Sequence, residues 1–367
     1  MKVGILTFHN AINYGAVLQC YALKELLTQY GHRVEVIDYR IPIVENRKKL
    51  LSTKIIRSRK GLTSKLRYIV KNLISYRKMR KSSRVFDEFL KVRLKLSPRV
   101  YSACDIPSYY DCIVFGSDQI WNPRLCGGFN PVFWGAFPKR NVKFVSFAAS
   151  LGEPKELNEE HWNRIGCLIN VFDKISVREK ELKICLENRF HIEVKRCLDP
   201  TLLVNQNCFE EILYTPQDTD YVFLYNVQKD PYATKFARFI AEKLNCKVIL
   251  GQAKPDVRKN IEVGCKLVEG FAPEMFLGYI KNARLVLANS FHAIAISLVF
   301  RKNFYSLDCA RPGRVKDLLA SLGLLDRHVS SRDLNIDIND VDYSLLSSKL
   351  QTLRAESLQF INEIEQL

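Results

Sequence analysis

The stretch Lys2–Tyr39, KVGILTFHNAINYGAVLQCYALKELLTQYGHRVEVIDY, decides the fold. Residues 2–7 form an apolar run typical of a buried strand, and residues 34–39 form a second one. Between them, residues 16–30 carry apolar side chains at helical spacing, and Gly31 is typical of a helix C-terminus. This order predicts a β-α-β unit, and with it a parallel sheet covered by helices.

The same alternation continues along the chain in two series. The first series adds apolar strands at 111–116, 143–148, 174–177 and 195–198. The second series adds strands at 221–225, 247–251, 267–269, 283–288 and 303–307, with helices between and after them. The sequence therefore predicts an α/β protein with two Rossmann-like, doubly wound domains that face a cleft.

We place the domain boundary near residue 205. The N-terminal domain then spans 1–205 and contains a basic helical insertion at about 41–100, where the rhythm of strands and helices breaks. The C-terminal domain spans 206–367 and carries the helix expected to bind phosphate, and its last helices are expected to pack back on the N-terminal domain. A chain of 367 residues is long enough for two hydrophobic cores.

Composition excludes several classes of protein. The hydrophobic share of 47% is that of an ordinary globular protein. The opening run is too short and polar for a secretory signal, and no apolar run approaches the ~20 residues of a membrane span. The 11 cysteines contain no Cys-x-x-Cys pair, which argues against zinc sites and disulfide frameworks. We therefore expect a cytoplasmic protein with reduced thiols.

The strongest local signal is the segment ANSFHA at 288–293, which follows a buried strand and opens a helix. The backbone N–H groups of such a turn bind anions, so we predict that the residues before the histidine contact substrate. His292, at the carboxyl edge of the sheet, is predicted to be exposed and catalytic. The alternative is an N-cap serine beside a structural histidine. The predicted binding residues are Asn289, Ser290 and Phe291.

The segment GSDQIWNP at 116–123 also follows a strand. Gly116 allows close approach of a ligand to the backbone, and Ser117 is a further candidate for substrate contact. Asp118 is a candidate base, and Trp121 a candidate platform on which a sugar stacks. The alternative is a simple turn with a half-buried tryptophan.

The opening loop HNAINYG at 9–15 places amide and ring groups at the end of the first strand. Asn13, Tyr14 and Gly15 are therefore candidates for substrate binding. The alternative is an ordinary β-α loop in which Asn13 caps the helix.

Two further strand ends carry charge. In SVREKE at 176–181, Arg178 could hold a carboxylate or phosphate in bidentate fashion, or form a surface salt bridge with Glu181. In LDPT at 198–201, Asp199 is a second candidate base, or an N-cap over Pro200. Five polar clusters at five strand ends predict a site at the edge of the sheets.

The sequence has no Gly-x-Gly-x-x-Gly and no Walker loop. Neither a dinucleotide nor a divalent-metal mechanism has support, so we predict no cofactor and no metal ligand.

Taken in order, these segments resemble the polysaccharide pyruvyl transferases. The matching stretches are GILTFHNAINYGAVLQCYAL, GSDQIWNP, SVREKE, LDPTLL and PEMFLGYIKNARLVLANSFHAIAISLVF, which lie between residues 3 and about 330. The resemblance implies a GT-B-like fold and transfer of pyruvate from phosphoenolpyruvate to two hydroxyls of one sugar. The product is a cyclic ketal on a glycan or lipid-linked precursor of a capsule or exopolysaccharide, and phosphate is released.

The resemblance also implies roles for particular residues. His292 matches the histidine of the family's Arg-x-His motif, whereas Ser290 stands where the family has arginine, so Arg178 is the candidate to supply the missing charge. The chemistry then needs His292 as general acid toward C3 of the donor. Asp118 is the first choice for the base that activates the sugar hydroxyl, and Asp199 is the second.

Two other functions remain as alternatives. A GT-B glycosyltransferase with a sugar-nucleotide donor would share the fold and the phosphate-binding helix, although we identify no acidic residue for a ribose. A non-catalytic nucleic-acid-binding protein would use the basic insertion. That insertion has few aromatic residues, and they fall on helical faces, so we predict no nucleic-acid partner. Those aromatic residues are Tyr68, Tyr76, Phe86 and Phe89.

The basic insertion holds the whole excess of positive charge. Residues 47–99 contain 19 lysines and arginines and two acids, and the net charge of the entire chain is +17. We predict that this segment docks on the anionic inner face of the membrane. Two alternatives are that its apolar face packs on the first domain, or that its charges bind a pyrophosphate of the acceptor. The apolar face would comprise Leu62, Leu66, Ile69, Val70 and Leu73.

Overall fold

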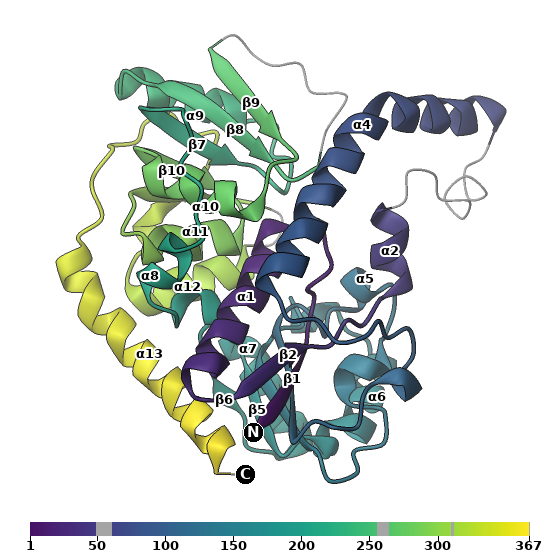
Figure 1. Ribbon diagram of the computed structural model, residues 1–367. Helices are drawn as coiled ribbons and strands as arrows, with labels where there is room; N and C mark the ends of the chain where they lie inside the picture. Colours follow the sequence, from purple (N-terminus) through teal and green to yellow (C-terminus); the bar gives the residue numbers. More distant parts are fainter. Residues whose placement is uncertain (49–60, 255–263, 310–311, 367) are drawn as a thin grey trace.

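The computed structural model describes residues 1–48, 61–254, 264–309 and 312–366 (Figure 1). Within these ranges the chain forms two six-stranded sheets whose strand pairs are all parallel. The first sheet comes from the first half of the chain and the second sheet from the second half. The predicted α/β class with two Rossmann-like sheets is thereby confirmed.

Both sheets change direction along the chain, as doubly wound sheets do. The first has the order β2-β1-β3-β4-β5-β6 and consists of β1 (Lys2–Leu6), β2 (Arg33–Val36), β3 (Cys112–Asp118), β4 (Lys143–Ala149), β5 (Lys174–Val177) and β6 (Lys195–Arg196). The second has the order β12-β11-β10-β7-β8-β9 and consists of β7 (Tyr221–Tyr225), β8 (Lys247–Gln252), β9 (Cys265–Glu269), β10 (Leu285–Ala288), β11 (Phe304–Leu307) and β12 (His328–Val329).

Helices cover the sheets and connect their strands (Figure 1). In the first half these are α1 (Tyr14–Gln29), α2 (Pro42–Lys48), α4 (Leu62–Arg93), α5 (Pro123–Cys126), α6 (Glu159–Leu168) and α7 (Lys180–Phe190). In the second half they are α8 (Gln206–Glu210), α9 (Ala233–Lys243), α10 (Pro273–Asn282), α11 (Phe291–Val299), α12 (Gly313–Leu322) and α13 (Tyr343–Glu365).

The opening β-α-β unit forms as predicted. The side chain of Asn13 caps α1 by accepting a hydrogen bond from the N–H of Gly15 at 3.0 Å. Gly31 follows the helix with a φ of +81°, which glycine adopts without strain. The strand after it ends at Val36 rather than at residue 39. Beyond Val36 this segment forms an isolated bridge, between Tyr39 and Val100.

The two sheets share one hydrophobic core, and Tyr14 lies in its middle. Its ring stacks on Phe86, Phe271 and Phe276, with centroid distances of 5.1, 4.8 and 4.5 Å. Its hydroxyl donates a hydrogen bond to the carbonyl of Phe271 at 3.0 Å. The prediction that Tyr14 contacts substrate does not hold, because the whole side chain is buried between helices of both halves.

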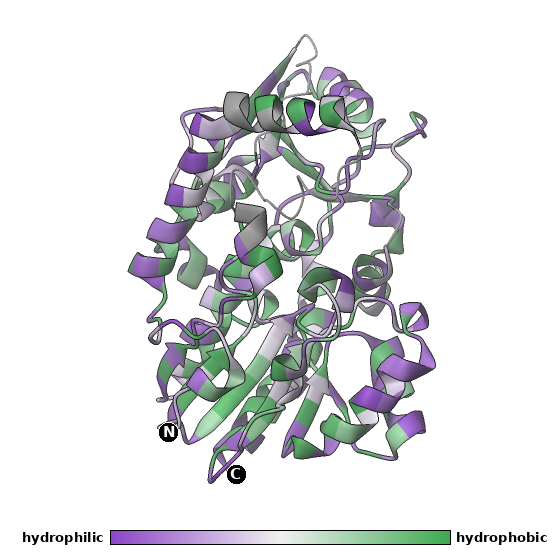
Figure 2. Ribbon diagram, turned by 90° about the vertical axis from the view of Figure 1, so that its right-hand side faces the viewer, coloured by the Kyte–Doolittle hydropathy of each residue, from purple (hydrophilic) through white to green (hydrophobic). Residues whose placement is uncertain are grey.

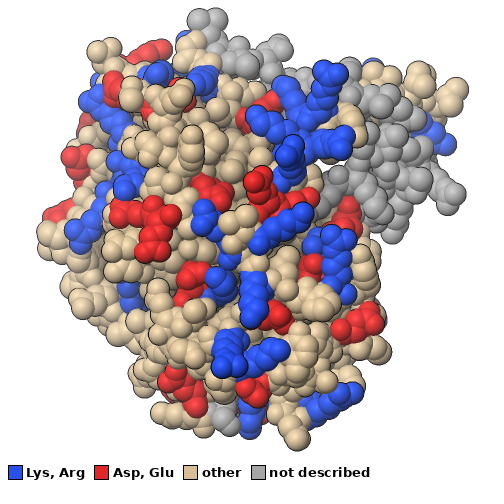
Figure 3. All heavy atoms as spheres, viewed as in Figure 1, with Lys and Arg blue, Asp and Glu red and all other residues tan. Residues whose placement is uncertain are grey.

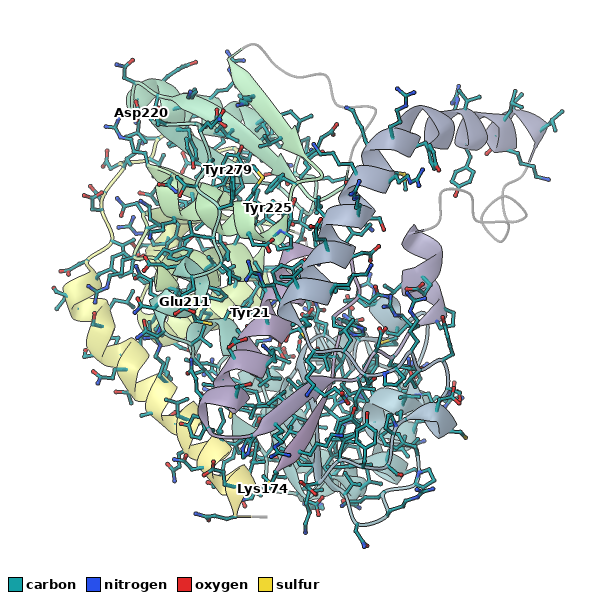
Figure 4. The ribbon with its side chains drawn as sticks, in the orientation of Figure 1. Tyr21, Lys174, Glu211, Asp220, Tyr225 and Tyr279 are labelled. Carbon is teal, nitrogen blue, oxygen red and sulfur yellow. The ribbon has the colours of Figure 1, made fainter. Side chains whose placement is uncertain are left out.

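The basic insertion is divided between core and surface. The second half of α4 buries Phe86, Phe89 and Leu90, and Phe89 lies against Tyr21 of α1 with centroids 6.1 Å apart (Figure 4). Its start extends away from the body of the molecule (Figure 1) and includes hydrophobic residues (Figure 2), several of which are exposed. The part of the helix that packs is therefore not the apolar face considered in the sequence, whose described residues are exposed.

Helix α13 returns across the first sheet. Lys174 of β5 pairs with Glu363 at 2.7 Å (Figure 4), and the N–H of Leu198 donates to the hydroxyl of Ser357 at 2.9 Å. The chain end thus lies beside the first strands (Figure 1). Together with the shared core, these contacts hold the two sheets against each other.

We expect Phe86→Ala to destabilise the protein by about 3–5 kcal/mol, because it leaves a cavity in the core that both halves share. The matched control is Tyr76→Ala on the same helix, where the side chain is 41% exposed. That change is expected to alter the free energy of unfolding by no more than about 0.5 kcal/mol. Urea unfolding measures both. Similar losses for the two variants would contradict the role of Phe86.

Candidate active site

Charged side chains meet at the carboxyl ends of β3 and β5, where the first sheet faces the starts of α11 and α12. Parallel strands place their carboxyl ends at the same edge, so residues far apart in sequence gather there. We call this group the charged cluster. Its members are Asp118, Arg178, Glu179, Asp199, His292 and Arg314.

Arg178 is the centre of the charged cluster. Its Nη1 donates to Asp199 Oδ2 at 2.8 Å, its Nη2 lies 3.4 Å from Asp118 Oδ1, and its Nε lies 3.6 Å from Glu179 Oε1. Burial alone would lower the pKa of Arg178, but the charges of Asp199, Glu179 and Asp118 raise it. A surface salt bridge with Glu181 is excluded, because Arg178 is buried. A ligand that bound both Nη atoms would compete with the carboxylates of Asp199 and Asp118, which already face them.

Asp199 is fully buried, and both of its carboxylate oxygens accept hydrogen bonds. Its Oδ1 accepts hydrogen bonds from the N–H and the hydroxyl of Thr201, at 3.0 and 2.7 Å. Its Oδ2 faces Arg178, the Ser117 hydroxyl at 3.1 Å and His292 Nε2 at 3.5 Å. Burial would raise the pKa of Asp199, yet the adjacent His292 and Arg178 hold it well below its usual range. The proposed role as a base does not fit this environment, whereas the N-cap alternative is confirmed.

His292 is buried rather than exposed as predicted, since only 6% of the residue is accessible. Its ring packs on Gly15: a Cβ added to that glycine would lie 2.2 Å from His292 Nδ1. Gly15 therefore provides the space for the imidazole instead of contacting a ligand. The ring is held between α1 of the first half and Asp199, and Nε2 is aimed at that carboxylate.

Three polar atoms of the charged cluster are buried and have no hydrogen-bond partner in the described part of the chain. They are Arg178 Nε, Glu179 Oε2 and His292 Nε2. Buried polar groups in native proteins are nearly always satisfied. One donor, one acceptor and one imidazole nitrogen in the same cluster fit a polar ligand with both acceptor and donor atoms.

Sequence reasoning missed two members of the cluster. Glu179 accepts a hydrogen bond from the Ser150 hydroxyl at 2.6 Å, and burial raises its pKa although Arg178 opposes the shift. Arg314 begins α12 and lies 3.8 Å from Asp118 Oδ1. Glu179 could have been found from its position beside Arg178 at a strand end. Arg314 follows no strand directly and belongs to no motif, so no local signal pointed to it.

The residues before His292 lie between the end of β10 and the first turn of α11, as the sequence predicts. Asn289 accepts from the N–H of Gln228 at 3.1 Å and donates to Asn226 at 2.7 Å, so it fastens the loop after β7. Ser290 stands at the N-cap position without the side-chain capping bond. The ring of Phe291 is buried, and the Arg178 guanidinium lies 4.7 Å from its centroid.

The segment GSDQIWNP, at the end of β3 and directly after it, also packs inside the protein. Trp121 stacks on Trp134 at 4.2 Å and donates to the carbonyl of Phe133 at 2.8 Å, so the predicted sugar platform is wrong. Ser117 is buried and supports Asp199. Gly116 has a φ of +117°, and an added Cβ would lie 2.5 Å from the carbonyl of Phe147. Its close backbone approach is therefore to β4, not to a ligand.

The described residues contain no group of three or more His, Cys, Asp or Glu side chains that could hold a metal ion. In that same part of the chain, every helix is too short or too polar to cross a membrane.

Two parallel sheets with a charged cluster between them define a two-domain α/β protein with a GT-B-like fold. A family described as polysaccharide pyruvyl transferase matches residues 13–311. The chain therefore belongs to the polysaccharide pyruvyl transferase family, a family of transferases of polysaccharide biosynthesis.

Solved structures agree with this fold. A UDP-GlcNAc 2-epimerase from Neisseria meningitidis bound to UDP-GlcNAc has a TM-score of 0.52 at 11% identity, with all of both chains covered. An S. aureus MnaA–UDP co-structure has a TM-score of 0.50 at 12% identity, covering 100% of this chain and 96% of that one. At these identities the likeness shows the fold alone. No curated protein matches the chain.

We expect Gly15→Ala to destabilise the protein by about 1–3 kcal/mol, because the new methyl group collides with the imidazole of His292. In a His292→Ala background the same change should be neutral or slightly stabilising, since alanine is the better helix former. Unfolding of the two single variants and the double variant measures this coupling.

Gly313→Ala is the matched control, because its added Cβ would meet nothing closer than 3.9 Å. Equal effects of Gly15→Ala in the presence and absence of the histidine ring would contradict the packing described.

Proposed function

We propose that the protein transfers the pyruvyl group of phosphoenolpyruvate to two hydroxyls of one sugar in a glycan or lipid-linked glycan precursor. The observation that carries this proposal is the family match over residues 13–311, together with the place of His292 in a buried cluster with two arginines. A histidine held by a carboxylate beside guanidinium groups suits proton transfer next to an anionic donor.

The reaction balances without an oxidant or a cofactor. C3 of phosphoenolpyruvate takes up a proton, which leaves a cationic C2. One sugar hydroxyl adds to C2 and a second closes the ring, while the bond from C2 to the phosphate oxygen breaks. Of the two hydroxyl protons, one replaces the proton delivered to C3 and the other leaves with phosphate.

The geometry favours a division of roles within the charged cluster. His292 is the general acid, and Asp199 holds its ring in place. Asp118 is the base, because its contacts with Arg178 and Arg314, at 3.4 and 3.8 Å, are looser than those that saturate Asp199. The oxygens of Asp118 are therefore less fully engaged than those of Asp199 and are the more available acceptors for a sugar hydroxyl.

The test incubates the purified protein with phosphoenolpyruvate and a panel of lipid-linked glycans. Mass spectrometry should find a product heavier by one pyruvate less water, with phosphate released in equal amount. Parallel reactions with sugar nucleotides examine the alternative, a GT-B glycosyltransferase. Glycosyl transfer without any pyruvylated product would overturn the proposal.

His292→Ala is expected to lower turnover by about 10²- to 10⁴-fold, because the general acid is lost. His161→Ala is the matched control, since this histidine lies on α6, outside the charged cluster. Circular dichroism and unfolding confirm that both variants are folded. Turnover near that of the wild type in folded His292→Ala protein would remove the residue from the mechanism.

We also propose that the start of α4 docks the enzyme on an anionic membrane surface. Leu62, Leu66 and Val70 are spaced four residues apart and are 81%, 61% and 48% exposed. Ile69 and Leu73, from the predicted apolar face, have side chains outside the described residues, as do residues 49–60 entirely. Basic side chains continue along the same helix (Figure 3), which suits an interfacial helix near anionic lipids.

We expect the protein to sediment with anionic vesicles, not with neutral ones, and to be released by high salt. Exchanging Arg77, Arg80 and Lys81 for glutamine should abolish sedimentation, because each basic residue near the surface contributes about 1 kcal/mol. The control is a variant in which Lys155, Lys235 and Lys316, which lie away from α4, are exchanged for glutamine. Equal binding to both kinds of vesicle, or to neither, would contradict docking.

A further inference from the structure

The charged cluster contains two guanidinium groups that approach one aromatic ring from different halves of the chain. Arg178 Cζ lies 4.7 Å and Arg314 Cζ 5.9 Å from the centroid of the Phe291 ring. The repulsion between two like charges is stronger where water is excluded, so two neighbouring guanidinium groups need negative charge nearby. The carboxylates of the cluster provide it for Arg178 but only partly for Arg314.

The two arginines differ in their ion-pair partners and in the exposed fraction of their side chains. Arg178 is engaged by three carboxylates and its side chain is 5% exposed. The Arg314 side chain is 24% exposed, and its ion pair, to Asp118, is 3.8 Å long. With its amide oxygen turned toward Arg314, Gln119 accepts hydrogen bonds from both Nη atoms at 3.1 and 2.7 Å. That partner is neutral, so it orients the guanidinium without balancing its charge.

The position of Arg314 is fixed from the first half of the chain. Three residues further along α12, Asp317 pairs with Arg196 Nη2 at 3.0 Å and accepts from the N–H of Lys180 at 3.3 Å. Arg196 also donates to the Ser321 hydroxyl at 2.9 Å. The start of α12 is thereby held against the first sheet, which keeps Arg314 at the rim of the cluster.

Electrostatics agree with a role for Arg314 at this rim. Burial, and next the charge of Arg178, lower the pKa of Arg314, although Asp118, Glu179 and Asp199 act in the opposite direction. An oxyanion beside Arg314 would relieve this repulsion. Arg178 Nε and His292 Nε2, which have no hydrogen-bond partner among the described residues, lie in the same cluster and could complete the contacts of such a group.

We propose that Arg314 binds the phosphate oxyanion of the ligand, whereas Arg178 positions Asp199 and through it His292. This assignment rests on the proposed function for the identity of the donor, but the anion site does not depend on it. The ligand is then held by a residue of the second half, while the groups that handle protons come from both halves, His292 from the second and Asp118 from the first.

The test measures the dissociation constants of phosphoenolpyruvate and of inorganic phosphate with the full-length protein by calorimetric titration. Arg314→Gln should weaken both by about tenfold or more, as expected for loss of a charge-assisted hydrogen bond. Arg314→Lys should fall between it and the wild type, because a point charge replaces a planar fork. Lys316→Gln, an exposed cation on the same helix, should bind both as the wild type does.

The outcomes separate this inference from the proposed function. Binding of phosphate that depends on Arg314, in a protein that forms no pyruvylated product, would support the anion site and remove the donor. Unchanged dissociation constants in folded Arg314→Gln protein, with pyruvyl transfer intact, would overturn the anion site alone. A wild-type protein that binds neither phosphate nor phosphoenolpyruvate would also overturn it.

Discussion

The buried ion pair between Arg178 and Asp199 is the contact on which the site depends. Its two groups leave water almost completely, and removing one partner of such a pair typically costs about 3–5 kcal/mol. It fixes the carboxylate that faces His292 and joins the end of β5 to the turn after β6. Asp118, Glu179 and Ser117 are arranged around this pair, so the placement of the groups proposed to handle protons follows from it.

The ion pair can stay dry because the two halves of the chain share a core. Tyr14 stacks against Phe86, Phe271 and Phe276 directly before Gly15, which in turn makes room for His292. The same short segment therefore packs the halves together and shapes the pocket of the histidine. The sequence predicts that this loop binds a ligand, but its role in the structure is to pack the protein. Its side chains set the distance between the two sheets.

The sequence predicted the sheets and the strand ends at which the site lies, because periodicity and the β-α-β order are local signals. It also brought Asp118, Arg178, Asp199 and His292 together, since parallel strands share a carboxyl edge. It could not show which of them are buried. Trp121 and Tyr14 read as binding residues but complete cores whose other members are distant in sequence. Arg314 carries no local signal, because only the docking of α12 on Arg196 brings it to the cluster.

The charges of the cluster connect ligand binding to proton transfer. Two arginines face three carboxylates, and burial raises the pKa of one of these, Glu179, although Arg178 opposes the shift. The positive and negative charges of the cluster therefore offset one another in large part before any ligand arrives. An anion that enters adds negative charge in a region of low dielectric, and this favours retention of protons by the groups around it. In the proposed reaction, where C3 of the donor must be protonated, the phosphate that leaves at the end would also help, on binding, to keep the required proton in the site.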